Sequence, residues 1–372
     1  MRAYLLLMAV AFGVTLLATF LVRKLAVKYR IYPKSIRARD VHAKPTPRIG
    51  GVAMFLGFVV SLLIAAPIGW FDVVFSDPLP IIAIAVSALI ITVIGFLDDI
   101  YDLDWTIKLA GQFIAAAVLA WNGVQIVSLP IFGITVGSFG VSFVVTVFLA
   151  VLIMNAVNFI DGLDGLVAGV VLIGTVVFFI YSYLLAQQIS PTNYFNLASM
   201  LSAIVIGMCL GFLPHNWHVA KIFMGDGGAL LLGLLMTTSA LTVTGQIDPA
   251  SLNRNDLVPA ILPLILPISI LVLPLLDFAL AVIRRLLAGK SPFAADRLHL
   301  HHRLQDFGHS HMGSVLVFYF WSISVSVSCL MLFLTDLVWV ILFAVISISA
   351  SFTYTVWPAV MKSRRKKVTV NV

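Results

Sequence analysis

Long apolar stretches separated by short polar connections run along almost the whole chain. A helix that crosses a bilayer needs about 20 mostly apolar residues, because lipid cannot satisfy open backbone hydrogen bonds. The pattern predicts eleven membrane-spanning helices, at 3–22, 51–70, 79–97, 109–124, 141–158, 167–187, 197–214, 227–245, 258–283, 315–334 and 337–358. The fourth of these stretches is short, and the ninth is interrupted by Pro263, Pro267 and Pro274. Alternating residues at 125–137 also predict a small exposed hairpin.

Composition supports a membrane protein. The 372 residues are 61% hydrophobic and only 10% charged, whereas soluble domains are about half apolar and a quarter charged. This excludes an ordinary soluble enzyme, a disordered chain and a secreted disulfide scaffold. Cys209 and Cys329 lie inside apolar runs, so a cysteine metal site is not expected. All 16 acidic residues are Asp, and the chain has no Glu.

Positive charge predicts the orientation. If the eleven stretches span alternately, all of the 23 Lys and Arg residues except Arg2 and Arg254 fall on one side. Basic loops stay in the cytoplasm, so the N-terminus is expected outside and the C-terminus inside. The cytoplasmic segments would be 23–50, 98–108, 159–166, 215–226, 284–314 and a basic tail at 359–372. The predicted fold is an all-α polytopic integral membrane protein with one transmembrane domain over 1–372.

The net charge of +7 invites a nucleic-acid interpretation, which we do not favour. The basic residues flank apolar stretches instead of forming a soluble basic face. Topology signals and contact with anionic lipid account for them more simply. The predicted partner is therefore the membrane, with no nucleic acid.

Eleven of the 16 Asp residues fall on the predicted cytoplasmic side, and the first group is D98-D-I-Y-D-L-D104. On a helix Asp98 and Asp102 would share a face, with Asp99 beside them. Adjacent carboxylates at a helix end could hold Mg²⁺ or act as a base. A solvated acidic loop is the alternative.

The second group is N155-A-V-N-F-I-D-G-L-D-G-L166, in which Asn155, Asn158, Asp161 and Asp164 recur every three residues. Amide and carboxylate oxygens repeated in this way suit Mg²⁺, which prefers hard oxygen ligands. The alternative is a glycine-rich turn whose Asn and Asp side chains cap helix ends.

The third group is K221-I-F-M-G-D-G-G228. Asp226 fits a helix N-cap as well as a metal ligand. Gly227 and Gly228 would let a phosphate approach a helix N-terminus. Phe223 suits either the membrane interface or stacking on a base.

The fourth group, at 284–311, holds five of the eight histidines among five basic residues. Cations with hydrogen-bond donors suit a diphosphate better than zinc. His309 and His311 are expected only to donate hydrogen bonds. Carboxylates for a divalent cation and donors for phosphates together indicate chemistry between a soluble nucleotide and a lipid phosphate.

Five motifs in order carry a family resemblance: H42-A-K-P-T-P-R-I-G-G51, D98-D-I-Y-D102 with Lys108 following, N155 to L166, F223-M-G-D-G-G228 and H299-L-H-H302. With eleven spans, the sequence resembles the polyprenyl-phosphate N-acetylhexosamine-1-phosphate transferases. The GlcNAc-1-phosphate branch is favoured. The muramoyl-pentapeptide branch usually has ten spans and a longer histidine run closed by Phe-Glu, and no Glu exists here.

The resemblance implies roles for residues in these motifs. Asp98 and Asp99 match the reaction centre, Asp226 resembles the principal Mg²⁺ ligand (Mn²⁺ is the alternative metal) and Asn158 an assisting ligand. Phe223 corresponds to the aromatic that stacks on uracil, with Asp161, Asp164 and Asn155 on the nucleotide side. The implied phosphate and sugar contacts are Lys108, Arg297, His299, His301, His302, Lys44 and Arg48. Asp277, in the broken ninth stretch, has no derived role.

The implied activity is Mg²⁺-dependent transfer of GlcNAc-1-phosphate from UDP-GlcNAc to a polyprenyl phosphate in a bacterial plasma membrane, which initiates a cell-envelope polysaccharide. We expect a single in-line displacement, with a covalent Asp intermediate as the alternative. A phospho-N-acetylmuramoyl-pentapeptide transferase is the main functional alternative, and a homodimer is left open. A secondary transporter is a distant alternative, because transporters place ionisable residues near the midplane of repeated, discontinuous helices.

Overall fold

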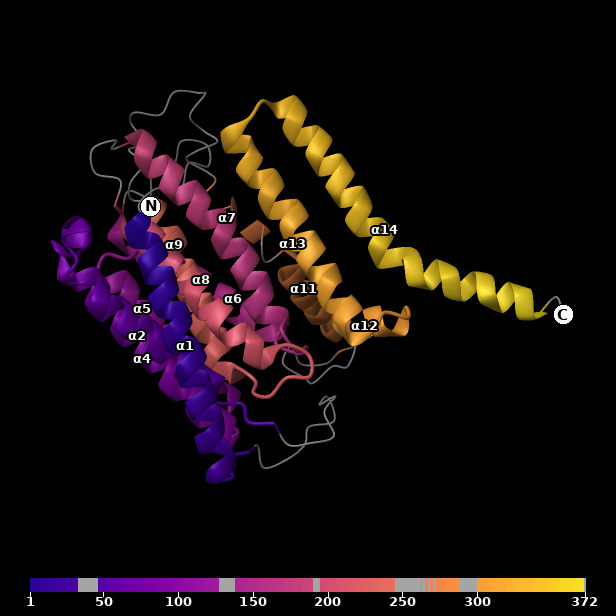
Figure 1. Ribbon diagram of the computed structural model, residues 1–372, viewed down its shortest axis with the longest axis horizontal. Helices are drawn as coiled ribbons and strands as arrows, with labels where there is room; N and C mark the ends of the chain where they lie inside the picture. Colours follow the sequence, from indigo (N-terminus) through magenta and orange to yellow (C-terminus); the bar gives the residue numbers. More distant parts are fainter. Residues whose placement is uncertain are drawn as a thin grey trace.

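The computed structural model describes residues 1–32, 46–126, 138–189, 195–244 and 300–370, with Val272–Leu287 and a few positions between 262 and 289. The regular structure in these residues is entirely helical (Figure 1). In chain order the elements are α1 (Arg2–Lys28), α2 (Gly50–Ala65), η1 (Gly69–Phe71), α3 (Asp72–Phe75), α4 (Pro78–Tyr101), α5 (Trp105–Trp121), α6 (Phe139–Phe159), α7 (Leu166–Ile189), α8 (Leu197–Asn216), α9 (Gly225–Thr244), α11 (Val272–Leu287), α12 (Leu300–Asp306), α13 (His311–Leu334) and α14 (Leu337–Val370).

Eight of the described helices are long and apolar enough to cross a membrane: α1, α4, α6, α7, α8, α9, α13 and α14. A ninth span is obtained if α2 is joined to the segment Gly69–Phe75, which meets it at an angle of 95°. α5 has only 17 residues. The predicted span 258–283 is described in part, as a few positions from 262 to 269 and the first twelve residues of α11, whereas most of the predicted hairpin at 125–137 lies outside the described residues. The all-helical polytopic fold is therefore confirmed, and eight or nine of the eleven predicted spans are seen as such.

Helix α9 lies in the interior of the bundle, where it packs against α2, α4, α6 and α8. In its apolar window 89% of the residues are buried, compared with 11% for α14. Helices α7 and α8 complete the centre, and α1 covers α8 on the outside. Helix α9, which carries Asp226 in its first turn, is thus surrounded by the other helices.

Close helix contacts use small residues. Gly207 and Gly211 of α8 face α1 so closely that a Cβ atom on either would overlap the backbone of α1 at Met8 and Phe12. Small residues four apart allow this approach in membrane helices, where packing replaces the hydrophobic driving force between helices.

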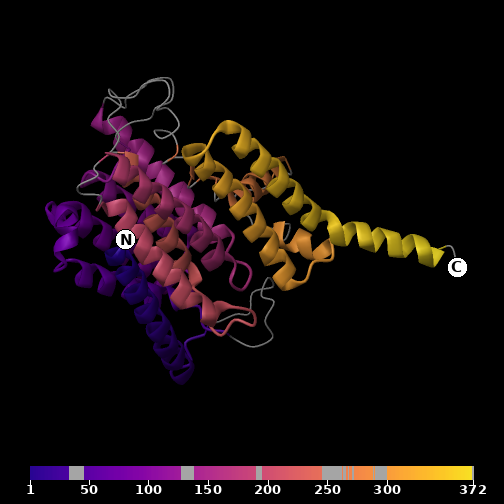
Figure 2. The ribbon, with the colours of Figure 1, turned by 45° about the horizontal axis from the view of Figure 1, so that its top comes forward.

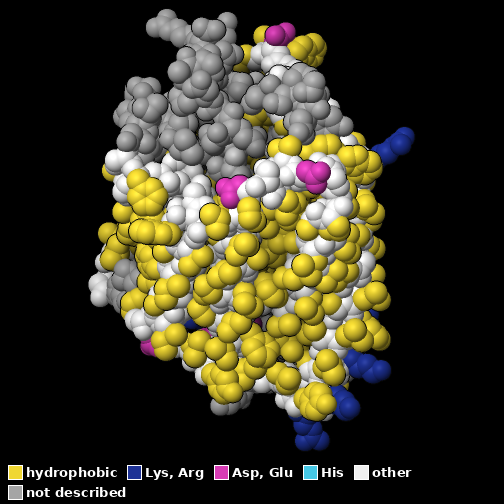
Figure 3. All heavy atoms as spheres, turned by 90° about the vertical axis from the view of Figure 1, so that its left-hand side faces the viewer, with side chains coloured by type: hydrophobic (Ala, Val, Ile, Leu, Met, Phe, Trp, Pro, Cys, Tyr) yellow, Lys and Arg dark blue, Asp and Glu magenta, His cyan; other side chains and the backbone are white. Residues whose placement is uncertain are grey.

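Helices α13 and α14 form an outer pair, because α13 packs against α7 while α14 packs against α13. The last part of α14 projects away from the bundle (Figures 1 and 2). The basic tail predicted at 359–372 therefore continues α14 as far as Val370. On the opposite side of the molecule, apolar side chains form a broad band, and most of the visible Lys and Arg side chains lie at one end of it (Figure 3). Such a band is the expected contact surface for lipid.

Candidate active site

Three of the predicted motifs meet at one end of the bundle. The C-terminal end of α4 carries Asp98 and Asp99, and the first turn of α9 carries Asp226. The first turn of α5 supplies Lys108, and the last turn of α6 supplies Asn158 beside the Asp226 carboxylate. Residues from four helices therefore surround one small region.

Glycines bring these helix ends together. A Cβ on Gly95 of α4 would overlap the backbone of Gly227, and a Cβ on Gly51 of α2 would overlap the backbone of Gly228. Glycine at these positions therefore serves the packing of α9 on α4 and α2, because a side chain would keep the backbones apart. The interpretation of Gly227 and Gly228 as an opening for a phosphate stays a prediction.

Lys108 joins two of the carboxylates. Its Nζ atom lies 3.0 Å from Asp98 Oδ2 and 3.1 Å from Asp226 Oδ2. The Lys108 side chain is 24% exposed and the Asp98 side chain only 2%. The counter-charge that a cluster of Asp residues requires is thus supplied from the next helix.

Asp98, Asp102 and Asp104 also stabilise the turn between α4 and α5. Asp98 Oδ1 accepts the Leu103 N–H at 2.9 Å. Asp102 has a φ of 55° and ends α4, so it does not continue the helical face of Asp98 as the pattern predicted. Asp104 caps α5 by accepting the Thr106 N–H at 2.9 Å, and the hydrogen bonds from Thr106 lower the pKa of its carboxyl group.

Asp99 completes the acidic group. Its Oδ1 accepts the Asp226 N–H at 3.3 Å, and it lies within the electrostatic reach of Asp226, Asp98 and Asp161. If Asp98, Asp99 and Asp226 are all ionised, their three carboxylates exceed the one ammonium group of Lys108 by two negative charges. A divalent cation would balance this excess, and the donor atoms are the hard oxygens that Mg²⁺ prefers.

The N-terminal motif reaches the same region through backbone pairing. The Phe223 N–H donates to Pro47 O at 2.8 Å, and the Gly50 and Gly51 N–H groups donate to Phe223 O and Met224 O at 3.0 and 2.8 Å. A Cβ on Gly225, which has a φ of 69°, would overlap the Arg48 carbonyl. The segment that contains Arg48 therefore lies directly beside the start of α9.

The residues that were predicted to bind the nucleotide, Asn155, Asp161 and Asp164, have different neighbours in the structure. Asn155 donates hydrogen bonds to Gln112 of α5 and to Val151 O, so its amide joins α6 to α5. Asp161 is half-buried and lies near Asp99. Asp164 is 2% exposed and faces His218 instead. Gln112 and His218 were not identified from the sequence, since neither belongs to a repeated pattern.

Several predicted contacts cannot be compared with the structure. Lys44, Arg297 and His299 lie outside the described residues, as do the side chains of His301, His302 and Asp277. His309 agrees with its predicted role, because its Nε2 lies 2.9 Å from the Thr355 carbonyl oxygen, which can only accept. The prediction for His311 is incomplete, because its Nε2 accepts the Asp164 N–H at 3.1 Å.

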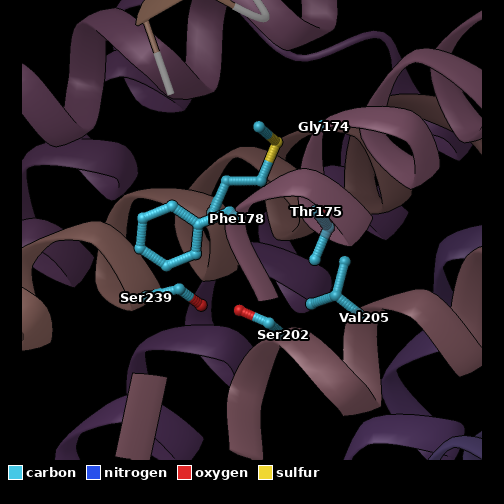
Figure 4. A pocket seen from close by; sticks show the side chains of 7 residues that line it. Gly174, Thr175, Phe178, Ser202, Val205 and Ser239 are labelled. Atoms are coloured by element: carbon cyan, nitrogen blue, oxygen red, sulfur yellow. The ribbon is translucent and has the colours of Figure 1, made fainter. Parts of the chain in front are cut away.

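A separate interior pocket lies among α7, α8 and α9 (Figure 4). It is lined by Gly174, Thr175, Phe178, Ser202, Val205, Met236 and Ser239. The Ser202 and Ser239 hydroxyls donate to carbonyls of their own helices. This pocket contains none of the predicted site residues, so the acidic cluster is the candidate active site.

The fold and the cluster define a polytopic helical membrane protein with a group of acidic residues at one end of its bundle. Residues 81–244 match the family model of glycosyl transferase family 4. A decaprenyl-phosphate N-acetylglucosaminephosphotransferase of Mycobacterium leprae is 41% identical over 318 residues, which are 83% of this chain and 78% of that protein. The chain belongs to this family, the polyprenyl-phosphate N-acetylhexosamine-1-phosphate transferases.

Two further relatives show the range of the similarity. A probable undecaprenyl-phosphate N-acetylglucosaminyl 1-phosphate transferase of Bacillus subtilis is 35% identical over 342 residues, covering 90% of this chain and 87% of the relative. A phospho-N-acetylmuramoyl-pentapeptide-transferase of Moorella thermoacetica is 30% identical over 298 residues, covering 75% and 81%. The similarity is thus stronger to the two GlcNAc-type enzymes, which confirms the branch favoured by the sequence motifs.

Proposed function

We propose that this protein is a phosphoglycosyltransferase that transfers GlcNAc-1-phosphate from UDP-GlcNAc to a membrane polyprenyl phosphate. The products are polyprenyl-diphosphate-GlcNAc and UMP, and the lipid product initiates a cell-envelope polysaccharide. The names of the most similar relatives support the substrates. The observation that carries the proposal is the Lys108 bridge between Asp98 and Asp226, because it brings the charged groups of two motifs, which are far apart in the chain, to one site.

Magnesium is the proposed cofactor, with Asp226 as the main ligand and Asn158 as an assisting one. The donor set fits, since it consists of carboxylate and amide oxygens and carries excess negative charge. When bound, Mg²⁺ would neutralise charge on the diphosphate. Lys108 is placed to add a second positive group to the same region.

The proposed reaction is a single displacement. An oxygen of the lipid phosphate forms a bond to the β-phosphorus of the nucleotide sugar, while the bond from that phosphorus to the bridging oxygen breaks and UMP leaves. Asp99 and Asp98 orient the acceptor phosphate or take its proton. Asp98 is nearly buried and anchored by Leu103 and Lys108, so we assign it mainly to holding Lys108. A phosphate monoester is largely ionised near neutral pH, so a strong base is not required.

The nucleotide is proposed to stack on Phe223, with Asp161 and Asn155 on the same side. Asp164 would support this subsite without contacting the nucleotide. Its carboxylate accepts the Ala220 N–H at 3.1 Å and so holds the segment that leads to Phe223. The proposed phosphate and sugar contacts are Lys108, Lys44, Arg48, Arg297, His299, His301 and His302.

The multi-pass bundle supports a membrane location, and we propose the bacterial plasma membrane with the active site on the cytoplasmic face. This orientation follows from the positive charges, with the N-terminus outside and the C-terminus inside. The whole chain would form a single transferase domain. A homodimer stays a prediction.

A direct substrate comparison tests the proposal. Purified protein is incubated with Mg²⁺, polyprenyl phosphate and either UDP-GlcNAc or UDP-MurNAc-pentapeptide, and UMP release is measured. We expect release with UDP-GlcNAc and little or none with the muramoyl substrate. Release only with UDP-MurNAc-pentapeptide would support the muramoyl alternative, for which the similarity to the Moorella thermoacetica enzyme provides a reason.

A further inference from the structure

A second group of metal-ligating side chains lies apart from the acidic cluster. Asp164 belongs to the turn between α6 and α7, His218 to the segment between α8 and α9, and His311 to the first turn of α13. One donor atom from each of the three residues lies within 4.8 Å of the others. Segments far apart in the chain thus present a carboxylate and two imidazoles to one point.

The distances fit a metal with nitrogen and oxygen ligands. His218 Nδ1 lies 2.9 Å and His311 Nε2 lies 3.8 Å from Asp164 Oδ2. Around tetrahedral zinc, with metal–ligand bonds of about 2.0–2.2 Å, neighbouring ligand atoms are roughly 3.3 Å apart. The observed separations lie on either side of this value, so small side-chain movements would bring the three donors into place.

The hydrogen bonds at His311 show which form of its ring faces the cluster. A backbone N–H can only donate, so His311 Nε2 must accept the Asp164 N–H and carry no proton of its own. That nitrogen lies 3.8 Å from Asp164 Oδ2. A metal ion bound at His311 Nε2 would take the place of the hydrogen bond from the Asp164 N–H, because the nitrogen has one lone pair to offer.

The two imidazole rings also lie against each other. The His218 and His311 rings are stacked, with centroids 4.5 Å apart and an interplanar angle of 23°. This contact limits the rotation of both rings and so keeps their nitrogen atoms near the Asp164 carboxylate.

Two of the three side chains, those of Asp164 and His311, are mostly buried, whereas His218 is accessible to solvent. Asp164 is 2% exposed and His311 12%, whereas His218 is 37% exposed. The ligands are also held by surrounding groups. Asp164 Oδ2 accepts the Ala220 N–H, and Ser310 caps the helix that begins at His311. An ion could therefore enter past His218 and meet preoriented donors.

We propose that Asp164, His218 and His311 form a binding site for a transition-metal ion of the zinc class, distinct from the magnesium site. Imidazole nitrogens select such ions over Mg²⁺, which prefers oxygen. With the metal at His218 Nδ1, the single proton of the neutral ring would be carried by Nε2, on the more exposed side of the side chain. The ion would tie the start of α13 to the turn before α7 and to the segment before α9, and so stabilise the packing of the outer helix pair on the bundle.

Metal titration of the purified full-length protein tests this site. After chelator treatment, the protein in detergent is titrated with Zn²⁺ in the presence of excess Mg²⁺, and bound zinc and the melting temperature are measured. We expect one tightly bound equivalent and a rise in melting temperature. His218→Ala and His311→Ala should each weaken this binding at least about tenfold and abolish the thermal shift.

Two controls make the result specific. His309→Gln removes a histidine outside the cluster but keeps a donor for Thr355 O, and it should bind zinc like the parent protein. Asp226→Asn should also keep the zinc site, which separates this inference from the proposed magnesium-dependent transfer. Zinc binding that is absent from the parent protein, or unchanged in His218→Ala and His311→Ala, would overturn the proposal and leave a hydrogen-bonded cluster only.

Discussion

Lys108 Nζ lies 3.1 Å from Asp226 Oδ2, although 118 residues separate them in the chain. The same ammonium group lies 3.0 Å from Asp98 Oδ2. This contact joins the starts of α5 and α9 to the end of α4. It also shows why carboxylates can be concentrated here, since part of their charge is balanced within the protein.

The first prediction concerns Asp226. Asp226→Asn should lower the rate of UMP release by at least about 100-fold, because it removes the proposed anionic metal ligand. The protein should still elute as a folded species in detergent, since the amide keeps the shape of the side chain. Near-normal turnover of the folded variant would contradict the assignment of Asp226 to the metal.

The second prediction concerns Lys108, whose positive charge lies between the carboxylates of Asp98 and Asp226. Lys108→Met should lower the free energy of unfolding by about 1–3 kcal/mol without Mg²⁺, because two carboxylates lose their partner in a partly exposed site. Added Mg²⁺ should recover part of this loss, since a divalent cation can replace the ammonium charge.

Thermal melts with and without Mg²⁺ measure both effects. Lys221→Met, which changes an exposed lysine before α9, is the matched control and should melt like the parent protein. If Lys108→Met and Lys221→Met melt at the same temperature and neither responds to Mg²⁺, Lys108 does not stabilise the carboxylates electrostatically.

The third prediction concerns the glycine contacts. Gly95→Ala should destabilise the protein by about 1–3 kcal/mol and lower activity, because the new methyl group would push the first turn of α9 away from α4. Gly13→Ala places a methyl group in open space on α1 and should leave both properties nearly unchanged. Melting temperature and UMP release in the two variants are the measurements, and equal behaviour would argue against the close approach.

The fourth prediction concerns nucleotide stacking. Phe223→Leu should raise the KM for UDP-GlcNAc by an amount equivalent to about 1–3 kcal/mol, because stacking on a base is worth this much in other proteins. The backbone pairing of Phe223 with Pro47 and Gly50 does not depend on the side chain, so kcat should change less. Phe223→Tyr keeps the ring and should retain a KM near that of the parent protein. A large fall in kcat with an unchanged KM would exclude the stacking role.

The fifth prediction separates the two mechanisms. Protein incubated with Mg²⁺ and UDP-GlcNAc labelled at the β-phosphate, without acceptor lipid, should carry no label and release no UMP. This follows because a single displacement needs the lipid phosphate before any bond breaks. A labelled protein, with one UMP released per enzyme, would establish a covalent intermediate on an Asp residue.

Some features of the site could be inferred from the chain because they depend on residue type and local spacing. Asp98 and Asp99 at the end of an apolar stretch, and Asp226 at the start of another, mark helix ends where charge avoids the hydrocarbon core. Their meeting could be expected only through the family resemblance. The roles of Asp102 and Asp104 in ending α4 and capping α5 depend on a turn whose backbone conformation the pattern does not specify.

The sequence by itself determined that this is a helical membrane protein, which motifs carry its chemistry and to which family it belongs, because hydropathy and motif identity are local properties. Tertiary structure decided the rest. Lys108 contacts carboxylates on two different helices. Gly95 and Gly51 allow the start of α9 to pack closely on α4 and α2. Asp164 lies beside His218 and His311. These relationships depend on how helices pack across large sequence separations, and helical periodicity along one segment contains no information about the partner that its face will meet.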